Sequence, residues 1–171
     1  RSSDLLHRAG DFAGAIATYR EVIAADPNHF RALNNLGACH EELDQHAEAE
    51  SAFRQALEIA PEEAPLHHNL GRLLHLEGRL DEAEQHYRRA LELDGSIGGV
   101  HFNLGRLLQE VGRHEDAEPA LRVAAAEDPD APAAHSFLGD ALFAQRRVDE
   151  ALVEYRRVTE LDPDDAAAHF D

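Results

Sequence analysis

The sequence predicts an all-α helical solenoid, because one pattern of residues recurs every 34 positions along the chain. Three sets of residues carry the period: a glycine preceded by leucine, an alanine, and a bulky side chain that is usually aromatic. They are Gly37, Gly71, Gly105 and Gly139; Ala15, Ala49, Ala83, Ala117 and Ala151; and Tyr19, Phe53, Tyr87, Leu121 and Tyr155. No insertion interrupts the period, so every repeat is expected to fold in the same way.

Each repeat contains two helical patterns separated by a short break. In residues 64–97, Leu66 and Leu70 begin one helical period, Gly78 interrupts it, and a second period runs through Tyr87. The repeat is therefore predicted to be a hairpin of two helices. The recurring glycines and alanines are expected to let the helices approach closely, with the bulky side chains filling the space beside them.

In chain order, the pattern gives five repeats and the beginning of a sixth within a single domain, residues 1–171. The repeats are 1–29, which lacks most of its first helix, 30–63, 64–97, 98–131 and 132–165, followed by the stub 166–171. The break between paired helices is expected at Gly10, Asp44, Gly78, Gly112 and Arg146, and the repeats end near Pro27, Pro61, Gly95, Pro129 and Pro163. Glycine suits the break because helices commonly end in a left-handed residue. The chain should hold ten helices and no strand.

Two departures from the pattern predict local irregularity. Pro119 falls near the start of a second helix, where it removes a backbone hydrogen bond, so that helix is expected to begin late or with a distorted first turn. Gly95 replaces the terminal proline and is followed by Gly98 and Gly99. The junction 94–100 is therefore expected to have the most backbone freedom.

The composition excludes several classes of function. With 16 basic and 34 acidic residues the net charge is −18, which disfavours nucleic acid as a partner. No apolar run approaches the roughly 20 residues of a membrane span, so no membrane insertion is predicted. The single cysteine, Cys39, occupies a position that is leucine in the two following repeats, and we expect it to be a buried structural thiol.

These residues resemble the tetratricopeptide repeat family. The resemblance rests on Leu70-Gly71 in a first helix, Gly78 at the turn, Ala83 and Tyr87 in a second helix, and Asp-Pro at the end of a repeat. It covers nearly the whole chain, with four full repeats between residues 30 and 165. The resemblance implies a right-handed superhelix of antiparallel helix pairs, in which the first helices line a concave groove.

Asparagine recurs two residues before the repeated glycine, at Asn35, Asn69 and Asn103. A primary amide both donates and accepts hydrogen bonds, so amides at one spacing are suited to the backbone of an extended peptide. This series resembles the asparagine ladder in the repeat arrays of O-linked N-acetylglucosamine transferases. The alternative is that asparagine is simply common at this position of the repeat and has no ligand.

A second set of groove residues surrounds these asparagines. Arg72 follows its glycine directly, with His68 and His75 on the same helical stripe, and Phe102 and Arg106 hold the equivalent positions in the next repeat. On so acidic a chain, two arginines in a groove would form a local positive pocket for a carboxylate. The alternative is that they pair with acids of the chain itself, such as Glu110.

Metal binding and catalysis are not predicted, and no cofactor is implied. Four histidines recur at the repeat spacing: His67, His101, His135 and His169. They occupy a framework position on successive helices, whereas zinc needs three or four converging ligands. The sequence contains neither a phosphate-binding loop nor an arrangement typical of a nucleophile and its base.

The predicted function is a noncatalytic module that binds a protein or an extended peptide in the groove. One alternative is the substrate-recruiting segment of a larger enzyme of the glycosyltransferase or sulfotransferase type, since the chain starts and stops inside a repeat. Another is a scaffold that self-associates through incomplete terminal repeats, because repeats without polar caps tend to associate.

Overall fold

The computed structural model describes residues 11–162, which form nine α-helices and no strand. The helices are α2 (Phe12–Ala25), α3 (Phe30–Glu41), α4 (His46–Ile59), α5 (Ala64–Leu76), α6 (Leu80–Leu93), α7 (Val100–Glu110), α8 (His114–Glu127), α9 (Pro132–Ala144) and α10 (Val148–Leu161). The predicted all-α helical repeat class is confirmed. The tenth expected helix and the sixth-repeat stub, with His169, fall before residue 11 and after residue 162, outside the described residues.

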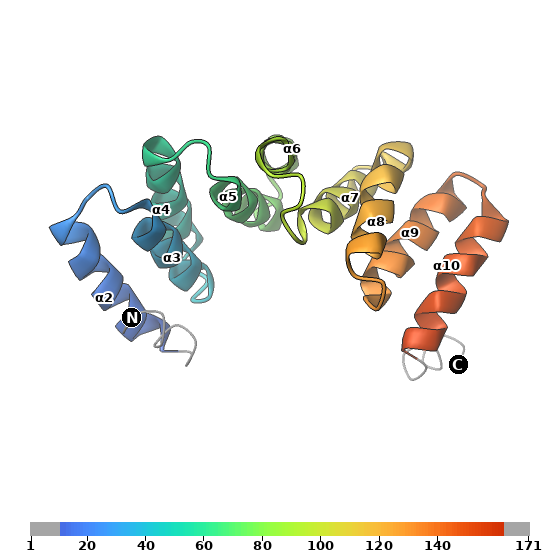
Figure 1. Cartoon of the computed structure of the whole chain (residues 1–171), viewed down its shortest axis with the longest axis horizontal. Coiled ribbons are helices and arrows are strands. Elements are labelled where there is room, and N and C mark those ends of the chain that lie inside the picture. Colours follow the sequence, from blue (N-terminus) through green and yellow to red (C-terminus); the bar gives the residue numbers. More distant parts are fainter. Residues whose placement is uncertain (1–10, 163–171) are drawn as a thin grey trace. The chain divides into compact units, whose positions relative to one another are not determined.

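The chain divides into two compact units, which we call the N-terminal unit, residues 1–97, and the C-terminal unit, residues 98–171. In the N-terminal unit α3 packs on α4 and α5 on α6, and α4 also contacts α5. In the C-terminal unit α7 packs on α8, α8 on α9 and α9 on α10 (Figure 1). Each helix therefore buries its apolar face against its neighbours in the sequence.

The breaks between paired helices lie where the repeat pattern places them. Asp44, Gly78, Gly112 and Arg146 have φ angles of 55°, 75°, 77° and 63°. This left-handed conformation ends the first helix of each pair and is costly for residues with a Cβ atom. Asp44 and Arg146 adopt it nevertheless, each between two helices that pack on one another. Gly10 is outside the described residues.

Each repeated glycine lies directly beneath the bulky side chain of its partner helix, as predicted. A Cβ atom on Gly37 would lie 2.6 Å from the Phe53 ring, and one on Gly71 would lie 2.9 Å from the Tyr87 ring. A Cβ atom on Gly105 would lie 2.5 Å from the Leu121 side chain, and one on Gly139 would lie 2.6 Å from the Tyr155 ring. Only glycine permits these contacts, because carbon atoms do not approach one another so closely.

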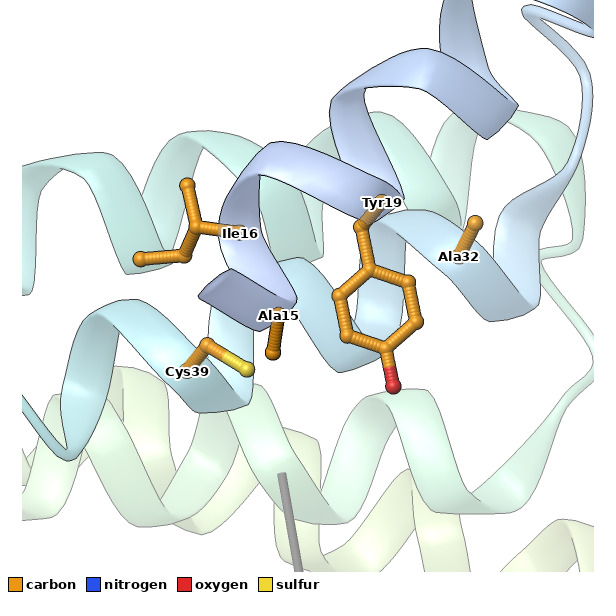
Figure 2. Close-up of a cluster of buried hydrophobic side chains, with 5 residues drawn as sticks. All are labelled: Ala15, Ile16, Tyr19, Ala32 and Cys39. Atoms are coloured by element: carbon orange, nitrogen blue, oxygen red, sulfur yellow. The ribbon is translucent and has the colours of Figure 1, made fainter. Parts of the chain in front are cut away.

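Cys39 lies in the core of the N-terminal unit. It is fully buried in a cluster formed by Ala15, Ile16, Tyr19, Ala32 and Cys39 itself (Figure 2). Burial raises the pKa of the thiol to about 11, and the neighbouring carboxylate of Glu42 adds to the effect. Because the thiolate is the reactive form, Cys39 is an inert packing residue, as the sequence predicts.

The expected irregularity at Pro119 is wrong. Helix α8 contains this proline in its interior, yet it begins at His114 and has the same 14-residue length as α4 and α6. Pro119 is exposed, and so is Glu115, whose carbonyl loses its helical partner. Water can satisfy that carbonyl, while burial of Ala117 and Leu121 fixes the course of the helix. Tertiary packing thus overrides the local preference.

Replacing Pro119 with glutamine, the residue at the equivalent position of α6, should raise the free energy of unfolding by about 1–2 kcal/mol. Glutamine restores the missing hydrogen bond and removes a ring from a helix interior, which outweighs the loss of a rigid residue from the unfolded chain. Urea denaturation of both proteins measures the difference. An unchanged or lower stability of Pro119→Gln would show that α8 accommodates the ring at no cost.

Candidate functional site

Three asparagine side chains of the N-terminal unit lie together on its first helices. Asn34 and Asn35 belong to α3 and Asn69 to α5. The amide nitrogen of Asn69 donates to the side-chain oxygen of Asn34 at 2.8 Å, and the amide of Asn34 donates to Asn35 at 3.4 Å. All three are half-buried. Since each amide offers two donors and an acceptor, these contacts leave most of the hydrogen-bonding capacity of Asn69 for a ligand.

A hollow opens next to these amides. It has a volume of about 210 Å³ and is lined by Phe30, Arg31, Asn34, Asn35, Glu63, Pro65 and Leu66. The Arg31 guanidinium lies 5.3 Å from the centre of the Phe30 ring, in the geometry of a cation–π contact. An amide pair, an aromatic ring and a guanidinium therefore line one small surface, which suits polar backbone groups better than an apolar ligand.

Arg72, on the same face of α5, is paired within the chain. Its Nη2 lies 2.9 Å from Oε2 of Glu41 at the end of α3. Burial raises the pKa of Glu41, although the guanidinium acts to lower it. Burial and the charge of Arg72 together lower the pKa of His68. Arg72 thus balances a half-buried carboxylate, the alternative considered for the groove arginines, with Glu41 as its partner rather than Glu110.

His75 is placed in the core rather than on the open surface. Its side chain is buried, and Nδ1 lies 3.4 Å from the hydroxyl of Tyr87, with the two rings edge to face at 6.1 Å. His75 therefore supports the packing of α5 on α6. Of the predicted site residues in this unit, Asn35, Asn69, His68 and Arg72 remain at least partly accessible.

The predicted site residues of the C-terminal unit lie on α7 in a more apolar setting. Phe102 packs edge to face against Phe137 of α9, with ring centres 5.5 Å apart. Gln109 donates from its side chain to the backbone oxygen of Phe137 at 2.6 Å. Arg106 and Asn103 are half-buried on the same helix. At the position of Asn34, two repeats earlier, this surface carries the ring of Phe102 in place of an amide.

The histidines at the repeat spacing have framework contacts. His67 donates from Nε2 to the backbone oxygen of Pro61 at 2.9 Å, so its Nδ1 accepts from His86 at 2.9 Å. Burial and the neighbouring His67 and Arg54 lower the pKa of His86 to about 4, which keeps the His86 ring neutral. His135 contacts the backbone oxygen of Pro129 in the same way. Over residues 11–162 no group of three potential ligands is arranged to hold a metal ion.

Sequence reasoning missed a hollow at the start of α7. It has a volume of about 360 Å³ and is lined by Gly98, Gly99, Phe102, Ala124, Glu127, Asp128, Ala131, Ala133 and Ala134. The signal was present in the pair Gly98-Gly99, which replaces the larger Phe30-Arg31 two repeats earlier. We interpreted those glycines as a flexible junction, whereas the structure shows that they also leave space beside Phe102.

A larger hollow of about 610 Å³ lies between α2 and α4 of the N-terminal unit, with Ile23, Leu33 and Leu36 among its lining residues. In the next repeat the positions of Leu33 and Ala52 are occupied by the bonded pair His67 and His86. The second helices contribute most of its walls, so it is separate from the surface formed by the first helices.

In the described part of the chain, no helix combines the length and apolar composition of a membrane span.

Two family models with the description tetratricopeptide repeat match the sequence. One matches residues 2–62, 30–96 and 62–126, and the other matches residues 102–166. No match was found among curated protein sequences.

Several solved structures have the same fold. A crystal structure of MamA is 23% identical, with a TM-score of 0.85 and 98% of each chain covered. YrrB, described as a TPR protein with an unusual peptide-binding site, is 22% identical, with a TM-score of 0.79 over 95% of this chain and 84% of its own. A structure of Pseudomonas aeruginosa pilF is 20% identical, with a TM-score of 0.84 over 93% of this chain and 72% of its own. At these identities the likeness concerns the fold alone.

Proposed function

The chain belongs to the tetratricopeptide repeat family, and from this premise we propose that it is a noncatalytic module that binds an extended peptide or partner segment against the first helices of its repeats. The observation that carries the proposal is the cluster of half-exposed amides in the N-terminal unit, where Asn34, Asn35 and Asn69 retain unused donors and acceptors. The peptide-binding site described for YrrB supports the same class of function.

The finer proposal is that these amides bind the peptide backbone, as in the asparagine ladder that the sequence resembles. Backbone groups are the same in every peptide, so amides give affinity that depends little on side chains. In the C-terminal unit, Asn103 of α7 occupies the same repeat position and is proposed to act in the same way, and Arg106 supplies a half-buried guanidinium for an acidic group of the ligand. Arg72 contributes less to this charge, because Glu41 already neutralises it.

Substituting Asn69 with alanine should weaken a bound peptide about fivefold, which corresponds to the roughly 1 kcal/mol of a typical hydrogen bond, and the same holds for Asn103. Calorimetry with a peptide selected from a random displayed library measures the affinity. Thermal unfolding should change little, because the amides are half-exposed and alanine favours a helix.

Matched controls separate binding from folding. Glu115 is an exposed residue of α8 and lies outside the proposed binding residues, so Glu115→Ala should leave the affinity unchanged. For Arg72 the double variant Glu41→Gln/Arg72→Gln is preferable, because removing the arginine alone would leave a half-buried carboxylate unpaired. If the asparagine variants bind the selected peptide as tightly as the parent, the amide proposal is wrong and the hollow between α2 and α4 becomes the next site to test.

Self-association is a second candidate function, favoured by an apolar face on α10. Val148, Leu152 and Val153 are 46%, 45% and 61% exposed. Leu152 occupies the position that is glutamate in the three preceding repeats. Light scattering over a range of concentrations tests this role, and Leu152→Glu should abolish any concentration-dependent increase in mass. A constant monomer mass for the parent protein would exclude it.

A further inference from the structure

The hollow at the start of α7 differs from its counterpart in the N-terminal unit in both size and chemistry. The two hollows lie at equivalent places, two repeats apart in the sequence. Phe30 and Arg31 occupy the positions of Gly98 and Gly99, and the volume rises from about 210 to about 360 Å³ where the glycines replace them. The larger volume is within the range of roughly 300–1,000 Å³ typical of ligand pockets.

The interior of this hollow is apolar. Ala124 and Ala134 are buried, and Ala131 and Ala133 add further methyl groups. The ring of Phe102 forms one wall, and its edge-to-face contact with Phe137 holds it in place. A surface of methyl groups and one fixed ring offers burial to an aliphatic or aromatic side chain.

The rim of the hollow is acidic. Glu127 and Asp128 both line it, and the nearest acid in the following loop, Asp130, is already paired with Arg157 at 2.9 Å. Oε1 of Glu127 lies 2.9 Å from Nδ1 of His101. The beginnings of α7 and α9 add partial positive charges of about half a unit each, which two full carboxylates outweigh. The counterpart positions in the N-terminal unit hold the uncharged Ile59 and Ala60.

We propose that this hollow is a side-chain pocket for an apolar residue of the bound peptide, and that a lysine or arginine beside this residue pairs with Glu127 and Asp128. The proposal rests on the peptide-binding function above and adds the class of peptide. Charge complementarity favours this occupant, because a basic peptide is attracted to the acidic rim and to the chain as a whole, whose net charge is −18.

Gly98 allows the pocket to be filled without strain. A Cβ atom at this position meets nothing within 4 Å, and its φ angle is not positive, unlike that of Gly99. Gly98→Leu therefore adds a side chain at the wall of the hollow, at the position where Phe30 lines the smaller hollow of the N-terminal unit. Gly95→Leu is the matched control, because a Cβ atom there makes an ordinary contact and the residue does not line the pocket.

Glu127→Gln/Asp128→Asn removes the negative charge of the rim, and Asp149→Asn, on an exposed residue of α10, is its control.

The test starts from a random dodecapeptide library displayed on phage and panned on the full chain. Enriched peptides should share an apolar residue next to lysine or arginine. The best peptide is then synthesised with its apolar residue changed to serine, or its basic residue changed to glutamate, and each change should weaken binding at least tenfold in calorimetry. Gly98→Leu should weaken the parent peptide about tenfold but should not further weaken the serine peptide, because both changes remove the same contact. The rim variant should reduce the salt dependence of binding.

The possible failures are distinguishable. If enriched peptides respond to Asn69→Ala but bind Gly98→Leu unchanged, the pocket assignment is wrong and the proposed function stands. If no peptide is enriched, both are wrong. If the parent chain self-associates in light scattering and Gly98→Leu does not, the pocket holds a second copy of the chain, and the peptide assignment is overturned.

Discussion

Replacing Phe53 with alanine should lower the free energy of unfolding by about 3–5 kcal/mol, the usual cost of deleting a fully buried aromatic ring. Phe53 has no exposed surface, and its ring lies directly over Gly37, where a Cβ atom would be only 2.6 Å away. The helices close only part of the cavity that the missing ring leaves, because the structure around a deleted core side chain relaxes only partially. Urea denaturation measures the loss.

A double-mutant cycle with Gly37 tests the cause. Gly37→Ala alone should cost about 1–3 kcal/mol, because the new methyl group overlaps the Phe53 ring. In the Phe53→Ala background the same change should be neutral or stabilising, since the overlap is gone and alanine favours a helix by about 1 kcal/mol over glycine. Gly95→Ala, with an ordinary contact distance of 3.6 Å, is the control. If the effects of the two substitutions on the free energy of unfolding were additive, close contact with the ring would not be the reason that glycine recurs at this position of the repeat.

The repeat period predicted these contacts because they recur within each pair of helices. Position in the repeat alone placed the breaks at Asp44 and Arg146, and both residues have a left-handed backbone although neither is glycine. The expectation that failed, at Pro119, rested on the local preference of proline and not on the period. Local preference was a poor guide where buried side chains on both sides determine the helix.

The candidate site was harder to predict than the fold. The asparagine register identified Asn35 and Asn69, but the partner of Asn69 is Asn34, whose position is histidine and phenylalanine in the following repeats. Asn34 and Asn69 occupy different positions in their repeats, so the contact between them leaves no periodic signal in the sequence. The hollow beside Phe102 arises from side chains that are missing at Gly98 and Gly99. Such a space becomes visible only when the surrounding helices are in place.

Converting Glu118 to glutamine should cost about 2 kcal/mol at pH 7, and this cost should shrink as the pH falls. Glu118 of α8 accepts hydrogen bonds from Arg122 at 2.9 Å, from Gln145 at 3.1 Å and from Arg147, so it ties α8 to the loop before α10. Burial acts to raise the pKa of Glu118, but the bonds from Arg147, Arg122 and Gln145 outweigh it and lower the pKa to about 2.

The direction of the pH effect follows from this shift. A carboxyl whose pKa is lower in the folded than in the unfolded chain stabilises the fold above its unfolded value, near 4.5, and loses that contribution as the pH falls toward about 2. Urea denaturation at pH 7, 5 and 3.5 should therefore give a gap between parent and Glu118→Gln that is full at the first two values and smaller at the third. Glu115→Gln, on an exposed residue in the first turn of the same helix, should show a gap of at most about 0.5 kcal/mol, the usual contribution of an exposed charge at that end of a helix. A gap for Glu118→Gln that is constant from pH 7 to 3.5 would mean that the shape of the side chain, and not its charge, holds α8 to the loop.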